Sequence, residues 1–130
     1  MSFFKYHFLF FFWLVLIFAE SSFPAEFYPK INIINADKIV HLGIYGLLAV
    51  FCYVSLIHQQ KFTFFKKYPV YYAVIITGVY GVTDELHQLF VPNRNCDFYD
   101  WLADFSGGII MGLIIKYYLQ KKISLFKALY

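Results

Sequence analysis

The sequence predicts an all-α, polytopic membrane protein folded as a four-transmembrane-helix bundle. Of its 130 residues, 61% are hydrophobic and 15% are charged, whereas about a quarter of the residues in a soluble domain are charged. Four apolar runs, at about residues 6–23, 38–57, 69–90 and 99–119, can each reach the roughly 20 residues that cross a bilayer as a helix. Helices are expected because a lone strand cannot satisfy its backbone hydrogen bonds in lipid. The length allows a single domain, which we expect over residues 1–130.

The predicted helices are bounded by residues that favour turns. Pro24 follows the first run, and Pro69 opens the third at a helix start, where proline is tolerated. Pro92 follows the end of the third run. In the fourth run, Gly108 and Gly112 form a Gly-x-x-x-Gly pair, which lets a neighbouring helix approach closely. We interpret this pair as a packing feature of the bundle.

The first run has an alternative interpretation. Lys5, the apolar stretch that follows and the small residues Ala19 and Ser21 also fit a secretory signal peptide that is removed. The aromatic run continues past the usual length of such a peptide's core, however. We therefore expect a retained first helix.

If the four runs alternate across a membrane, most basic residues fall on one side of the membrane and the acidic residues fall on the other. One side receives the N-terminus, the 58–67 loop and the C-terminal tail, with eight of the eleven basic residues. All eight acidic residues fall on the other side. Because segments rich in lysine and arginine stay in the cytoplasm, both termini are predicted to be cytoplasmic and the acidic side to face outward. The lysines flank apolar runs and do not line a face, which argues against nucleic-acid binding.

Polar and ionisable residues gather at the outer ends of the last three runs. Lys38, His41 and Tyr45 follow one another at i, i+3 and i+7, so they share one face of a helix. A group of this kind at one end of a bundle predicts a ligand-binding site. The candidate ligand-binding residues are Asp37, Lys38, His41, Tyr45, Asp84, Glu85, His87, Gln88, Arg94, Asp97, Asp100 and Asp104.

The depth of these residues indicates a recessed pocket. Asp84, His87 and Gln88 share a face of the third run. Only 11 residues separate Asp104 from Lys116, about 16 Å of helix, while the hydrocarbon core is about 30 Å thick. Asp104 is therefore expected below the outer interface. Because an isolated charge in lipid is costly, it should face the bundle interior and pair with another group.

The same residues form three ordered motifs that resemble those of the VanZ-like family of small integral membrane proteins. The motifs are Asp37-Lys38-x-x-His41-x-x-x-Tyr45, Asp84-Glu85-x-His87-Gln88-x-Phe90-x-Pro92-x-Arg94 and Asp97-x-x-Asp100-x-x-Ala103-Asp104-x-x-Gly107. The resemblance covers about residues 20–112, including Ser21-Ser22-x-Pro24. Asp104 departs from the pattern, because asparagine is expected there in much of the family.

The resemblance implies a multi-pass protein of the bacterial plasma (inner) membrane, and thus a place in the cell envelope. The family is named for a protein associated with resistance to teicoplanin, a lipidated glycopeptide antibiotic. We therefore expect an outward-facing polar pocket that binds a lipid-linked head group or an amphiphilic glycopeptide-type antibiotic, with a role in antibiotic resistance. The expected partners are membrane lipids and a lipid-linked cell-wall precursor or a lipoglycopeptide. The oligomeric state is left open.

Two other function classes stay open. The first is a membrane enzyme that modifies a lipid head group by general acid–base chemistry. Its candidate catalytic residues are His41, Asp84, His87 and Asp104. The second is a proton-coupled transporter that uses buried carboxylates, although four helices leave little room for a translocation path.

We predict no cofactor and no metal site. Imidazole and carboxylate ligands suit zinc or manganese, but the chain has no His-x-x-x-His or Cys-x-x-Cys spacing. The residues considered for such a site are His41, His87, Asp84, Glu85 and Asp100.

Overall fold

The computed structural model of the chain describes residues 2–28 and 36–129. Over these residues it is helical, without strands, which confirms the all-α prediction. The elements are α1 (Ser2–Ser21), η1 (Ala25–Phe27), α2 (Ala36–His58), α3 (Thr63–Lys67), α4 (Pro69–Gln88) and α5 (Phe98–Leu129).

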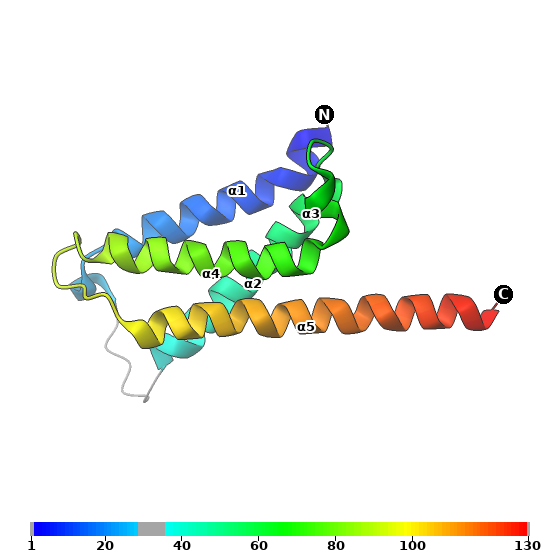
Figure 1. The fold of residues 1–130 in the computed structure, drawn as a ribbon. Coiled ribbons are helices and arrows are strands. Elements are labelled where there is room, and N and C mark those ends of the chain that lie inside the picture. Colours follow the sequence, from blue (N-terminus) through cyan, green and yellow to red (C-terminus); the bar gives the residue numbers. More distant parts are fainter. Residues whose placement is uncertain (1, 29–35, 130) are drawn as a thin grey trace.

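The four long helices correspond to the four predicted runs, with two differences. The short helix α3 was not predicted, because it lies within the polar connection between the second and third runs. Helix α5 continues well past residue 119 and extends beyond the other helices in Figure 1. Its apolar run ends before Gln120, but the following residues include strong helix formers and neither glycine nor proline. Apolarity therefore marks where this helix can contact lipid, and the helix propensity of the following residues lets it continue past that point.

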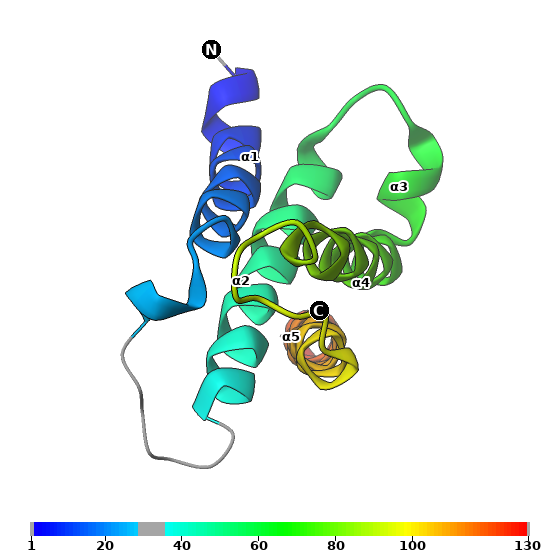
Figure 2. The same cartoon turned by 90° about the vertical axis from the view of Figure 1, so that its left-hand side faces the viewer.

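Helix α2 lies at the centre of the fold. It contacts α1, α4 and α5, and α5 also packs along α4. Figure 2 shows this arrangement almost along the axis of α5. A buried cluster of Ile17, Tyr45 and Leu48 joins α1 to α2. A second cluster joins Cys52 and Leu56 of α2 to α4.

Glycines in α5 allow this close packing. A Cβ atom at Gly107 would lie only 2.2 Å from the backbone oxygen of Leu42 in α2. A Cβ atom at Gly112 would lie 2.8 Å from Val74 in α4, and Gly108 faces the same helix. The predicted role of the Gly108 and Gly112 pair in helix packing is confirmed. Gly107 provides a still closer contact, on the face of α5 that packs against α2.

Many large hydrophobic side chains are exposed on the outer surface of the described helices. Helix α1 from Phe4 to Ser21, helix α2 over its whole length and helix α5 from Phe98 to Lys122 are long and apolar enough to cross a membrane. Helix α4 is not among them. Its tyrosines and the pair Asp84 and Glu85 interrupt its apolar run.

The connections lie at two opposite ends of the molecule. Figure 1 shows η1, the start of α2, the end of α4 and the start of α5 together at one end. The start of α1, the helix α3 and the end of α5 lie toward the other end. Two lysines, Lys66 and Lys67, occupy the last turn of α3. The first of these ends carries the predicted site residues.

Candidate functional site

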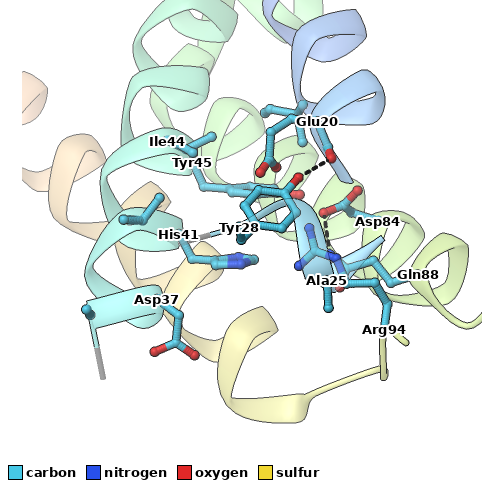
Figure 3. Close-up of a pocket in the computed structure, with 13 residues that line it drawn as sticks. Glu20, Ala25, Tyr28, Asp37, His41, Ile44, Tyr45, Asp84, Gln88 and Arg94 are labelled. Atoms are coloured by element: carbon cyan, nitrogen blue, oxygen red, sulfur yellow. Dashed lines mark hydrogen bonds between the residues drawn. The ribbon is translucent and has the colours of Figure 1, made fainter. Parts of the chain in front are cut away.

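A pocket of about 450 Å³ lies at this end, between α1, η1, α2 and α4 (Figure 3). It draws residues from each of these elements and from the segment between α4 and α5. Six of the predicted site residues line it, namely Asp37, His41, Tyr45, Asp84, Gln88 and Arg94.

The pocket also has an apolar wall that was not predicted from the sequence. Ile17 of α1 and Val40 and Ile44 of α2 form it. Val40 and Ile44 each follow a predicted polar residue, Asp37 or His41, at a spacing of three. Helical spacing could therefore have placed Val40 and Ile44 beside the site. Ile17 could not be found in this way, because sequence spacing does not show which helix faces α2.

Tyr28, which was also not predicted as a site residue, supports Arg94. The guanidinium carbon of Arg94 lies 4.4 Å from the centre of the Tyr28 ring, within the range of a cation–π contact. The Tyr28 hydroxyl donates a hydrogen bond of 2.5 Å to the backbone oxygen of Glu20. Burial, together with Glu20, raises the pKa of Tyr28 to about 12, so the phenol stays protonated. The Nε of Arg94 donates to the backbone oxygen of Phe23 at 3.3 Å, which fixes the guanidinium at the pocket.

Two buried polar atoms at the pocket have no hydrogen-bond partner among the described residues. They are the hydroxyl of Tyr45 and Oδ1 of Asp84. The other oxygen of Asp84 accepts a weak hydrogen bond of 3.4 Å from Gln88. Buried polar atoms are normally satisfied by protein, water or a ligand. The pocket therefore offers a ligand both a donor and an acceptor.

Lys38 takes part in an ion-pair network beside the pocket. Its Nζ donates to Asp37 and Asp97 at 2.9 Å and to Asp100 at 2.6 Å. Asp97 also accepts a hydrogen bond of 2.8 Å from the backbone N–H of Tyr99, which caps the start of α5. The hydrogen bond from Lys38 holds the pKa of Asp97 below its ordinary value. Lys38, Asp97 and Asp100 do not line the pocket, and they tie α2 to the start of α5.

Asp104 lies in the interior, paired with His41. It is fully buried, and its Oδ1 lies 2.8 Å from Nδ1 of His41. Gly81 of α4 faces the Asp104 carboxylate, where a Cβ atom would come within 3.0 Å of Oδ2. Glu85 follows one turn later and is also buried. His41, Glu85 and Asp104 each offer one atom able to bind a metal ion, and these atoms lie within 4.8 Å of one another.

His87 lies apart from this group. Its Nε2 is 3.0 Å from the hydroxyl of Ser22, and its ring packs against Phe18. It does not line the pocket. Of the two histidines proposed as acid–base candidates, His41 is therefore the one at the pocket.

An apolar exterior, three helices able to span a bilayer and an internal polar site define a helical membrane protein. The model of the family described as VanZ/LLP1 matches residues 6–120, and the chain belongs to this family. The resemblance seen in the sequence motifs is thus confirmed. No curated protein and no solved structure matches the chain.

Proposed function

We propose that α4 is a fourth membrane span and that the pocket faces outward from a bacterial plasma membrane, with both termini in the cytoplasm. Four polar residues of α4, namely Thr77, Asp84, Glu85 and Gln88, are buried inside the protein. Its exposed side chains are largely apolar, as a lipid-facing surface requires. They include Tyr71, Ile75, Val79, Val82 and Leu86. The lysine-rich end then lies on the cytoplasmic side.

The pocket, on this proposal, binds the head group of an amphiphile. The supporting observation is that one pocket joins an apolar wall of Ile17, Val40 and Ile44 to polar groups from several elements. Val40 is 52% exposed, so this wall continues to the outer surface of α2. An acyl chain can lie along the apolar wall while a polar head group fills the end of the pocket. A lipid-linked cell-wall precursor and a lipoglycopeptide such as teicoplanin both have this chemistry, and binding the antibiotic would give a role in resistance.

The polar side chains of the pocket can bind different parts of a head group. Arg94 presents a planar group suited to two parallel hydrogen bonds with a phosphate or a carboxylate. Asp84 and Asp37 can accept hydrogen bonds from ammonium or hydroxyl groups. The Tyr45 hydroxyl can serve as a further donor. The ligand that fits best therefore carries an anionic group together with hydrogen-bond donors.

An equilibrium titration tests this proposal. Purified protein in nanodiscs is titrated with teicoplanin and with teicoplanin from which the acyl chain has been removed. The wild type should bind the acylated form more tightly. Arg94→Gln and Asp84→Asn should each weaken binding about tenfold or more, since a hydrogen bond to a charged group contributes about 1.5–3 kcal/mol.

The matched control is Lys66→Gln, which removes a charge at the opposite end of the molecule. It should bind like the wild type. Equal binding of both forms of the antibiotic, or equal weakening by all three variants, would count against the pocket as the binding site.

One observation favours a second candidate function, a membrane enzyme that modifies a lipid head group. His41 lines the pocket and is hydrogen-bonded to buried Asp104, an arrangement that orients a general acid or base. Lipid profiles of cells by mass spectrometry test it. A lipid species that changes with wild-type expression should revert in His41→Ala but not in His87→Ala. Identical profiles with and without the protein would exclude this activity for the lipids detected.

A further inference from the structure

Next to the pocket, three helices bring together side chains that can ligate a metal ion. His41 comes from α2, Glu85 from α4 and Asp104 from α5. One ligand atom of each lies within 4.8 Å of the other two. Asp104 is 0% exposed and Glu85 is 3% exposed. The group differs from the one considered from the sequence, since it includes Asp104 and excludes His87, Asp84 and Asp100.

Two oxygen atoms of the group are buried and have no hydrogen-bond partner among the described residues. They are Oδ2 of Asp104 and Oε1 of Glu85. The other oxygen of each carboxylate is held in place. Oδ1 of Asp104 lies 2.8 Å from His41, and Oε2 of Glu85 accepts a hydrogen bond of 2.7 Å from the backbone N–H of Asp97. In each carboxylate, a hydrogen bond to one oxygen thus fixes the orientation of the group. The other oxygen is available to bind a further partner.

The negative charge of the two carboxylates also favours the binding of a cation. The nearby Lys38 is ion-paired with Asp37, Asp97 and Asp100. One imidazole therefore faces two buried carboxylates. Buried carboxylates are costly unless their charge is compensated, and a divalent ion supplies the largest compensation in the smallest space.

We propose that His41, Glu85 and Asp104 bind a divalent transition-metal ion. One imidazole and two carboxylates suit Zn²⁺ or Mn²⁺. Bonds of about 2.0–2.2 Å place the ligand atoms of a tetrahedral site about 3.4 Å apart, so binding draws the three groups closer together. Three protein ligands leave one coordination position for water or another ligand. Because His41 also lines the pocket, the ion lies beside it. The site does not depend on which ligand the pocket binds.

Direct metal binding tests this site. The full chain is purified in detergent with an affinity tag that lacks histidine, stripped with a chelator and titrated with ZnCl₂ and, separately, MnCl₂. Bound metal is measured by mass spectrometry after removal of free ions. Wild-type protein should bind one ion per chain. His41→Ala and Asp104→Asn should each lower the affinity at least about tenfold, and His87→Ala should bind like the wild type.

Two further measurements keep the test decisive. If Asp104→Asn elutes as an aggregate, Glu85→Gln takes its place, because it also keeps the side-chain shape. Co²⁺ bound to the wild type should give the visible absorption of a four-coordinate site. Failure of the wild type to retain Zn²⁺ or Mn²⁺, or equal affinity of His41→Ala and His87→Ala, would overturn the proposal.

Discussion

Nδ1 of His41 lies 2.8 Å from Oδ1 of Asp104, although the two residues are 63 positions apart in the sequence. This pair joins α2 to α5 beside the pocket, which His41 lines. Asp104 is completely buried, so its carboxylate has no access to water. The pair consequently connects the stability of the fold to the chemistry of the site.

Replacing His41 by leucine should destabilise the protein. The substitution leaves a buried carboxylate without its hydrogen-bond partner, which costs about 1–3 kcal/mol in the free energy of unfolding. The double variant His41→Leu/Asp104→Leu should recover part of this loss, because the unpaired carboxylate is then gone. Denaturant unfolding in detergent with a chelator measures both variants. A double variant that is no more stable than His41→Leu would contradict the pairing.

Gly107→Ala should prevent α2 and α5 from packing. Its Cβ would lie 2.2 Å from the backbone oxygen of Leu42, a distance that only backbone movement can relieve. We expect little folded, monodisperse protein by size-exclusion chromatography. Gly43→Ala is the matched control, since nothing lies within 4 Å of a Cβ at that position. It should be as stable as the wild type or about 1 kcal/mol more stable, because alanine favours helix over glycine. Equal behaviour of the two variants would refute the predicted helix contact.

The charge of Asp97 should stabilise the fold at neutral pH but not at low pH. Lys38 lowers the pKa of Asp97 in the folded state. A carboxylate with a lowered folded pKa contributes stability above its unfolded pKa of about 3.9, and this contribution disappears as the pH falls through the folded pKa. Asp97→Asn keeps a residue able to cap α5 and removes only the charge. Its melting temperature should lie below that of the wild type at pH 7 and approach it in strong acid. A difference that stays constant between these pH values would contradict the ion pair.

Cys96 reports on the orientation of the protein. It is exposed, free and located in the connection between α4 and α5, at the pocket end. A membrane-impermeant maleimide should therefore label it on intact cells. Cys52 is buried and should stay unlabelled in the folded protein. Cys96→Ser removes the signal, and Lys61→Cys in that background should label only after the cells are permeabilised. Labelling of Cys96 only after permeabilisation would reverse the proposed orientation.

The long helices could be predicted from the sequence because apolar runs and helix-breaking residues act locally. Lipid exposure requires a continuous apolar run, and Pro69 marks the start of α4 as expected. The end of α5 was harder to place, since the helix continues beyond its apolar run. The close approach around Gly108 and Gly112 was also predictable, because small residues at this spacing leave one face of a helix open.

The detailed site was less predictable, because spacing assigns a residue to a helix face but does not identify the neighbour of that face. Asp84 and Glu85 are adjacent in the sequence, yet consecutive helical residues point about 100° apart. Asp84 accordingly lines the pocket, while Glu85 turns toward His41 and Asp104. His87 shares a predicted face with Asp84 but contacts Ser22 of the loop after α1. Such differences depend on how the helices are arranged around α2.

The most direct test of the pocket is to identify what it holds. Native mass spectrometry of the protein, released from membranes in mild detergent, should detect a bound amphiphile with a polar head group. Val40→Trp fills the pocket from its half-exposed wall and should lose this ligand. Ile39→Trp, on the adjacent residue outside the pocket, should retain it. We expect about one bound amphiphile per wild-type chain, and equal retention by both tryptophan variants would contradict binding in this pocket.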